Sequence, residues 1–286
     1  MSTTLPFGHY IYNGNGFFST GSQLVYVDYA YQKTWFSSDG LFWSSVNWGV
    51  SSTWYDGMVE GCYIAPYAYG TAAIDLYGST ALFLARSTDF ITWTIQVSEG
   101  SRMDLSPFST QSVIGHSGTI YRFTHNGSYI TFISTTPPAS VWSAYTASNL
   151  PVAQVAPLYG LFGPAILSAF GAFWSLPPGN ATYKKIYTSS DAISWTIATS
   201  DWGMGTSGWR SYVVTPTLVT ILLGNGETWD TPDMLNWTLR IPATVVPDTG
   251  MFLLPLGADL FCVSNWNAKI YKLSNYYTPS PIGHPL

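Results

Sequence analysis

The chain has 286 residues, of which 10 Lys and Arg and 15 Asp and Glu make only 9% charged side chains, against about 25% in an ordinary soluble domain. The formal net charge of -5 leaves no surplus of basic residues to neutralise phosphates, which excludes nucleic acid as an expected partner. No apolar stretch approaches the roughly 20 residues of a membrane-spanning helix, and the first residues have neither the basic nor the apolar segment of a secretory signal peptide. We therefore expect a soluble chain that is not exported by that route.

Aromatic residues make up 17% of the chain, and 26 Gly and 18 Pro interrupt it throughout. Gly and Pro are the poorest helix formers, whereas Tyr, Trp, Thr and Val favour strands, so the composition predicts an all-β fold. The two cysteines, Cys62 and Cys262, are too few for a disulfide framework or a four-cysteine zinc site. We interpret both as small buried apolar residues, with a disulfide between them as the alternative.

A short pattern recurs four times along the chain. It reads Ser/Thr-x-Asp-x-x-x-Trp-Ser/Thr and first occurs at residues 37–44. Four copies of a pattern that is fixed at three points identify a structural repeat. The four pairs are Asp39 and Trp43, Asp89 and Trp93, Asp191 and Trp195, and Asp233 and Trp237.

The spacing of the motif tryptophans indicates the size of the repeat. The first two are 50 residues apart, the last two are 42 apart, and 102 residues separate the second from the third. A degenerate copy that keeps Trp142 but lacks the Asp lies in this gap, and a weaker sixth copy lies near residues 270–275. The chain then divides into six units with approximate bounds 1–48, 49–98, 99–148, 149–199, 200–241 and 242–286.

Each unit has room for four short strands punctuated by turn residues. The fourth unit shows this best, with strand-like runs at 165–168, 171–176, 183–187 and 195–198. Four strands in a unit of about 40 to 50 residues are typical of a β-propeller blade. The sequence therefore predicts one propeller domain over residues 1–286, with six four-stranded antiparallel blades and with five or seven blades as alternatives.

The four motifs resemble the Asp-box, or bacterial neuraminidase repeat, of sialidase-like propellers, in a shortened form with Asp and Trp four positions apart. In that family the box occupies the turn between the third and fourth strands, on the outer rim away from the substrate, so the resemblance implies a structural role. The chemistry of the residues agrees, because Asp and Ser/Thr side chains bind backbone groups of tight turns while the Trp packs between sheets.

Ligand binding in a propeller is expected on the opposite face, which is formed by the loops between blades and between the second and third strands. Aromatic, acidic and Arg residues fall at these places, and such residues suit a sugar-binding surface, because aromatic faces stack on sugar rings and charged groups bind hydroxyls. The alternative is that the tryptophans fill gaps between blades as core. The candidate ligand-binding residues are Trp54, Asp56, Glu60, Arg102, Asp104, Trp202, Trp209, Arg210 and Trp266.

No complete catalytic constellation accompanies these residues. The sialidase resemblance would require three Arg that grip a carboxylate, and only Arg102 and Arg210 fall at suitable places. A glycoside hydrolase or lyase needs only two carboxylates at a suitable separation, so it stays as the alternative. Its candidate carboxylates are Asp56, Glu60, Asp104 and Asp201.

The sequence thus predicts a protein that is not an enzyme and needs neither a cofactor nor a metal. The repeats resemble the short-Asp-box propellers of bacteriophage structural proteins, which implies a virion component assembled in the host cytoplasm. Its expected partners are other virion proteins or a glycan on the host surface. A propeller that only binds neighbouring subunits is the third possibility.

Overall fold

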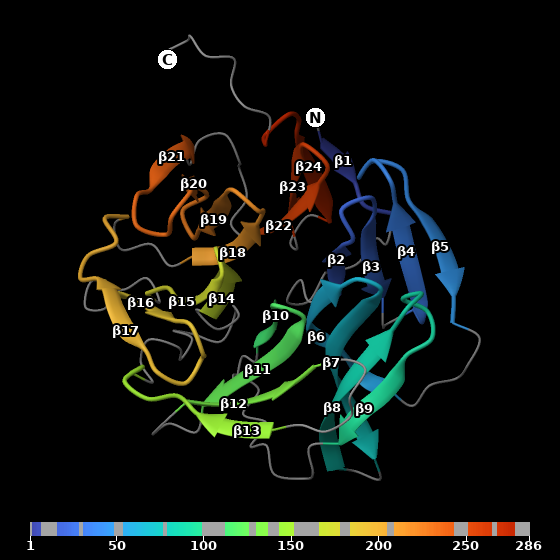
Figure 1. The fold of residues 1–286 in the computed structure, drawn as a ribbon. Coiled ribbons are helices and arrows are strands. Elements are labelled where there is room, and N and C mark those ends of the chain that lie inside the picture. The colour runs from blue at the N-terminus through green and yellow to red at the C-terminus, as the bar shows by residue number, and fades with distance from the viewer. Residues whose placement is uncertain are drawn as a thin grey trace.

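The structure is a computed structural model, and it describes residues 2–6, 16–28, 31–48, 54–76, 79–98, 112–125, 130–136, 143–151, 166–177, 184–204, 209–242, 251–264 and 268–277. Every extended regular element within these ranges is a β-strand, and the strands are labelled β1 to β24 in Figure 1. The predicted all-β fold is therefore confirmed for the described part of the chain.

The described strands form six antiparallel sheets of four strands each. Five of these sheets use four consecutive strands, because short connections pair each strand with its neighbour in sequence. These strands are β2 (Phe17–Ser19), β3 (Leu24–Asp28), β4 (Lys33–Ser37) and β5 (Ser44–Asn47); β6 (Trp54–Ile64), β7 (Tyr67–Leu76), β8 (Ser79–Ser87) and β9 (Thr94–Ser98); β10 (Ser112–His116), β11 (Thr119–His125), β12 (Ile130–Thr135) and β13 (Ser143–Thr146); β14 (Ile166–Ala169), β15 (Ala172–Ser175), β16 (Ile186–Ser189) and β17 (Thr196–Thr199); β18 (Trp209–Val214), β19 (Val219–Leu223), β20 (Thr228–Thr231) and β21 (Thr238–Ile241).

The remaining sheet joins the two ends of the described chain. Its strands are β22 (Met251–Leu256), β23 (Asp259–Ser264), β24 (Lys269–Leu273) and, at the outer edge, β1 (Ser2–Thr4). The register pairs Thr3 with Ile270, and the amide of Leu5 donates to the carbonyl of Ala268 at 2.6 Å. This corrects the predicted unit 1–48, because its first strand belongs to the last sheet.

The sheets follow one another around a common centre, as Figure 1 shows. In the five sheets of consecutive strands the first strand lies nearest the centre and the fourth lies on the rim, whereas in the last sheet β22 lies nearest the centre and β1 lies on the rim. This is a β-propeller with four-stranded antiparallel blades, as the sequence predicts, and the number of described sheets equals the number of repeat units. Each sheet has two edge strands, one nearest the centre of the ring and one on the rim.

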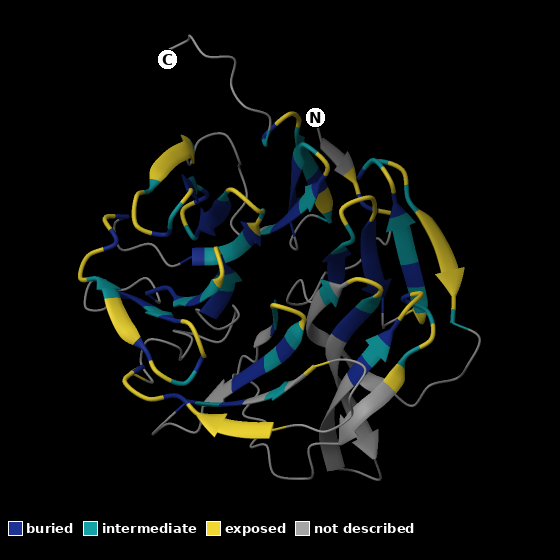
Figure 2. Cartoon of the chain, in the orientation of Figure 1, coloured by how far each residue is buried: buried dark blue, intermediate teal, exposed yellow. Residues whose placement is uncertain are grey.

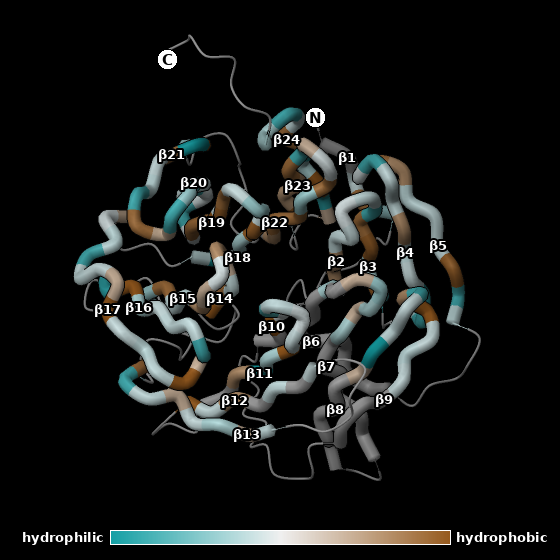
Figure 3. Tube along the Cα trace, in the orientation of Figure 1, coloured by the Kyte–Doolittle hydropathy of each residue, from teal (hydrophilic) through white to brown (hydrophobic). Residues whose placement is uncertain are grey.

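Apolar side chains fill the spaces between neighbouring sheets. One cluster joins the last sheet to the first through Phe261, Leu254, Phe17 and Leu24, and others lie between further neighbours around the ring. The second strands β3 and β19 are buried at all five positions, because both of their faces meet a neighbouring sheet. Figure 3 shows the corresponding hydrophobic segments in the inner strands.

The rim contrasts with this interior. All four residues are exposed in β5 and β13, and Figure 2 shows β5, β13, β17 and β21 largely in the colour of exposed residues. The outer strands β5, β13, β17 and β21 each pair along one edge with the third strand of their sheet. Within the described ranges, no helix is long and apolar enough to cross a membrane.

Candidate functional site

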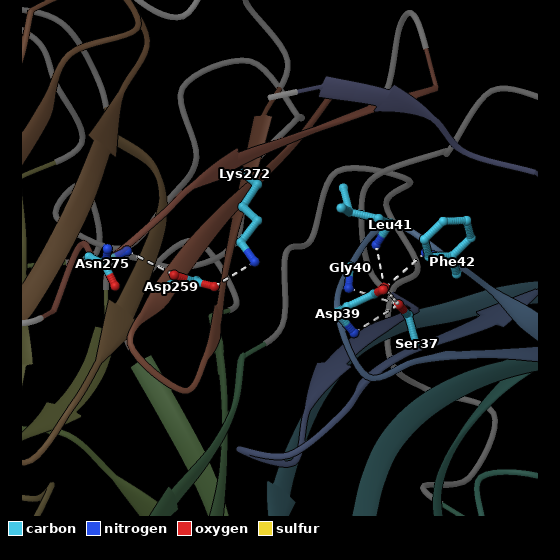
Figure 4. A network of polar contacts seen from close by, with 8 residues as sticks. All are labelled: Ser37, Asp39, Gly40, Leu41, Phe42, Asp259, Lys272 and Asn275. Atoms are coloured by element: carbon cyan, nitrogen blue, oxygen red, sulfur yellow. Dashed lines mark hydrogen bonds and ion pairs between the residues drawn. The ribbon is translucent and has the colours of Figure 1, made fainter.

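The first Asp motif forms a compact turn between β4 and β5 (Figure 4). Asp39 Oδ1 accepts hydrogen bonds from the amides of Leu41 at 2.8 Å and Phe42 at 2.9 Å. The Ser37 hydroxyl donates to the same oxygen at 3.1 Å and accepts from the Gly40 amide at 2.8 Å. The carboxylate and the hydroxyl thus satisfy backbone donors that a tight turn leaves unpaired.

The same geometry recurs in the other three motifs, each of which joins the third strand of a sheet to the fourth. In all four turns the Asp accepts amide hydrogen bonds of 2.7–2.9 Å from the residues two and three positions later. In three of them the motif Trp donates from Nε1 to the carbonyl of the residue that follows the Asp. The motifs therefore lie in the turns where the sequence places them, and their hydrogen bonds suit a structural role.

These hydrogen bonds favour the charged carboxylate. The Asn236 amide, followed by the other donors of its turn, lowers the pKa of Asp233 to about 2. The Ser194 and Ile193 amides likewise lower the pKa of Asp191. For Asp39 and Asp89 partial burial works in the opposite direction, but the amide donors outweigh it and the pKa of each is lowered.

The residue after each motif Asp connects its turn to the preceding sheet. It has a positive φ in all four turns: 72° at Gly40, 60° at Phe90, 64° at Ala192 and 66° at Met234. Phe90 packs its ring 5.4 Å from that of Phe18 on β2, in the first sheet. The carbonyl of Phe90 also accepts a hydrogen bond from the Thr34 hydroxyl on β4 at 2.5 Å. The turns therefore couple neighbouring blades as well as closing hairpins.

Two of the predicted ligand-binding residues are core residues instead. Trp202 is 3% exposed and Trp209 is 8% exposed, and both belong to the apolar cluster between the sheets of β14–β17 and β18–β21. The prediction that both are exposed on a binding surface is therefore wrong, because neighbouring blades cover the rings. The alternative interpretation, in which tryptophans fill the gaps between blades, holds for this pair.

The other predicted ligand-binding residues divide into two groups. Trp54, Asp56 and Glu60 lie on β6, the innermost strand of its sheet, so their placement in a loop is wrong. Arg210 also lies on an innermost strand, β18, where the register with β19 shifts between Trp209 and Ser211. Such a bulge interrupts the regular alternation of side chains between the two faces of the sheet. Arg210 is half-buried. Arg102, Asp104 and Trp266 fall outside the described residues.

Innermost strands of adjacent sheets are tied together by serine side chains. The Ser19 hydroxyl on β2 donates to the carbonyl of Pro255 on β22. Ser211 Oγ on β18 accepts a hydrogen bond from the Leu253 amide at 3.0 Å. Between the third and fourth sheets, Ser168 Oγ on β14 lies 2.8 Å from Nδ1 of His116 on β10. These contacts place hydroxyl and imidazole groups on the strands nearest the centre.

A second polar cluster lies on the boundary between the fifth and last sheets. Asp230 on β20 is 8% exposed and accepts hydrogen bonds from Thr220 at 2.7 Å and from the Tyr276 hydroxyl at 3.0 Å. Arg240 Nε lies 3.9 Å from its other oxygen. Burial raises the pKa of Asp230 although these partners oppose the shift. Because the cluster fastens the segment after β24 to a neighbouring blade, its position suits a structural role.

Metal and thiol chemistry find little support among the described residues. No group of three or more His, Cys, Asp and Glu side chains within them could hold a metal ion. Cys262 on β23 is a buried free thiol, and burial raises its pKa to about 12. The interpretation of Cys262 as a small buried residue is confirmed, while the side chain of Cys62 falls outside the described part.

Comparison with known proteins finds likeness at the level of the fold. No protein-family model and no curated protein sequence matches the chain. Among solved structures, the chain is similar to YCF48 bound to D1 peptide, with a TM-score of 0.60 and 12% identity over 98% of this chain and 97% of that one. Virginiamycin B lyase from Staphylococcus aureus has a TM-score of 0.57 and 9% identity over 96% and 98% of the two chains. These likenesses support the propeller fold alone.

Proposed function

We propose that the chain is a non-enzymatic structural and attachment protein of a bacteriophage particle, which binds neighbouring virion subunits or a glycan of the host surface. The observation that supports this proposal is that the described carboxylates are engaged in hydrogen bonds within the fold. Each Asp or Glu whose side chain is described accepts a hydrogen bond from another group of the chain. These residues are Asp28, Asp39, Asp89, Asp191, Asp201, Glu227, Asp230, Asp233 and Asp259.

The low charge of the rim supports assembly into a larger particle. The outer strands β5, β13 and β17 contain no charged residue, and each exposes one larger apolar side chain: Val46, Tyr145 and Ile197. Exposed sheet edges of free proteins are commonly protected by charge, whereas the centres of permanent interfaces are depleted in it. A rim of this kind suits contact with neighbouring subunits better than full exposure to solvent.

The likeness to YCF48 adds support for a binding role. That structure is described as bound to D1 peptide, so a propeller of similar fold and size holds a protein segment. The resemblance of the four Asp turns to short-Asp-box propellers of bacteriophages supports the virion location. Trp202 and Trp209 are buried and offer no surface on which a sugar ring could stack. This favours binding to neighbouring subunits over binding to a glycan.

The proposal is tested by locating the protein and measuring what it binds. Quantitative mass spectrometry of purified particles should find the chain at a fixed copy number, as expected of a structural component. The isolated protein should retain attachment to particle subunits or to host cells without releasing any product. Absence from purified particles, or turnover of a bound polysaccharide, would contradict the proposal.

A glycoside hydrolase or lyase is the second candidate, and one observation favours it. Asp56 and Glu60 both lie on β6, the strand of their sheet nearest the centre of the ring. Two carboxylates at a suitable separation are sufficient for glycoside hydrolysis. If host polysaccharide were shortened by the protein and Asp56→Asn or Glu60→Gln abolished the release of oligosaccharides, this candidate would replace the binding protein.

A further inference from the structure

The contact between Ser168 and His116 differs in chemistry from the other two serine contacts of the inner strands. Ser19 binds a backbone carbonyl and Ser211 binds a backbone amide, and neither group can take a proton from a hydroxyl. Ser168 instead lies 2.8 Å from an imidazole nitrogen, within the reach of a general base. Among the three, Ser168 has the partner that activates serine nucleophiles.

Packing holds the imidazole in a fixed orientation. The ring of His116 lies 4.3 Å from that of Phe173 on β15 and meets Tyr121 on β11 edge-on at 6.2 Å. Because β10, β14 and β15 are strands of two adjacent sheets, the pair is positioned by the rigid part of the fold. Both Ser168 and His116 are half-buried, so each residue keeps part of its surface in contact with solvent.

The surroundings also keep the imidazole neutral. Burial lowers the pKa of His116 below its usual value. The titratable group in ring contact with it is Tyr121, whose own pKa is raised by burial and by Tyr145 and Asp191, so that the phenol stays protonated. A neutral imidazole is the form that accepts a proton, so His116 is competent as a base at neutral pH.

We propose that Ser168 is a nucleophilic serine that accepts an acyl group from an ester, with His116 as its general base. In the reactive tautomer the ring proton is on Nε2 and Nδ1 accepts the Ser168 proton. The Oγ attacks the ester carbonyl, the carbon–oxygen bond to the alcohol breaks, and the imidazolium returns the proton to the leaving alcohol. The products are an acyl-serine and an alcohol, with no net proton change.

This inference is independent of the proposed function. An acyl-serine on the inner strands requires neither a virion location nor polysaccharide turnover, and it adds a covalent modification site to a binding protein. The ligand class that it assigns is an activated carboxylic ester. Binding of subunits at the rim is unaffected by it, since β10 and β14 lie nearest the centre (Figure 1).

The test uses p-nitrophenyl acetate on the full chain. We expect one equivalent of p-nitrophenolate per chain and one acetyl group, which peptide mass spectrometry locates on Ser168. His116→Asn keeps a hydrogen-bonding atom beside Ser168 but removes the base, so labelling should slow by about 100-fold or more. Ser211→Ala is the matched control, and its labelling rate should equal that of the parent chain.

Three results would overturn the proposal. They are acetylation confined to Lys, Tyr or other Ser residues, no acetylation above that of an unfolded control, and equal labelling rates in the parent chain and His116→Asn. Thermal unfolding of each variant establishes that it is folded. If His116→Asn fails to fold, the dependence of labelling rate on pH in the parent chain decides: a rise through a pKa below 6.5 supports His116 as the base, and a flat profile contradicts it.

Discussion

A single carboxylate oxygen organises each of the four Asp turns, because it accepts the amides two and three residues later and a hydroxyl two residues earlier. All of these partners lie within a few positions in sequence. The role of Asp191 could therefore be predicted from the sequence, since no distant part of the chain is needed to complete its contacts. The same reasoning fails for His116, whose partner Ser168 is far away in sequence and on another sheet.

Replacing Asp191 by Ala removes the acceptor of the Ile193 and Ser194 amides and of the Ser189 hydroxyl. We expect the free energy of unfolding to fall by about 1–3 kcal/mol, with attachment unchanged. Denaturant unfolding measures the loss. Asp201→Ala is the control, because Asp201 is exposed, accepts the Gly203 amide at 3.0 Å where Asp191 accepts two amides and a hydroxyl, and forms a long ion pair with Lys184 at 3.8 Å. A stable Asp191→Ala protein that had lost attachment would contradict the structural role.

The lowered pKa of Asp233 predicts a dependence of stability on pH. The folded chain holds this carboxylate charged down to a pKa of about 2, below the ordinary value of 3.8. The unfolded chain binds the proton first, so the stabilisation is present above 3.8 and is lost as the pH falls towards 2. Unfolding measured across this interval should show a smaller decline for Asp233→Asn than for the parent chain. Equal declines would show that Asp233 does not contribute.

Turns and strands are coupled across sheets in ways that the sequence does not reveal. The burial of Trp202 and Trp209 depends on side chains of an adjacent sheet, such as Leu167 and Leu176. The local sequence pattern around each tryptophan does not indicate which distant side chains will cover it. The segment around Asp56 contains Gly and acidic residues and is interpreted as a loop from sequence, yet it pairs as β6 with three shifts of register against β7. Pairing with a long neighbouring strand outweighs its weak intrinsic preference.

Gly40 provides a direct test of the coupling between a turn and the preceding sheet. A Cβ at this position would lie 2.1 Å from Cε1 of Phe261 on β23, so either the turn or the ring must move. We expect Gly40→Ala to destabilise the fold by about 1–3 kcal/mol beyond the cost of a positive φ. Gly118→Ala is a matched control, because Gly118 has a φ of 77° but a Cβ added there would meet no atom within 4 Å. Equal losses in thermal unfolding would show that the contact with Phe261 is unimportant.

At the scale of the whole molecule, repetition made the propeller predictable. Each unit carries its own turn signals, so the four-stranded blades follow from the period of the Asp motifs. Closure of the ring was not predicted, because β1 has three residues, Ser2–Thr4, and pairs with β24 at the opposite end of the chain. A strand of this length carries no periodicity of its own, and only the free edge of the last sheet specifies its place.

Leu5 tests how much this closure stabilises the ring. Its side chain is 2% exposed in the cluster that joins the last sheet to the first, and its amide donates to the Ala268 carbonyl. Leu5→Ala keeps that backbone bond and removes only the apolar contact, so we expect a loss of about 2–5 kcal/mol in the free energy of unfolding. Leu239→Ala on β21, at a position that is 42% exposed, should cost less than about 0.5 kcal/mol. If the two variants unfolded at the same denaturant concentration, the segment around β1 would not stabilise the closed ring. The contacts among β22, β23 and β2 would then hold the ring closed without it.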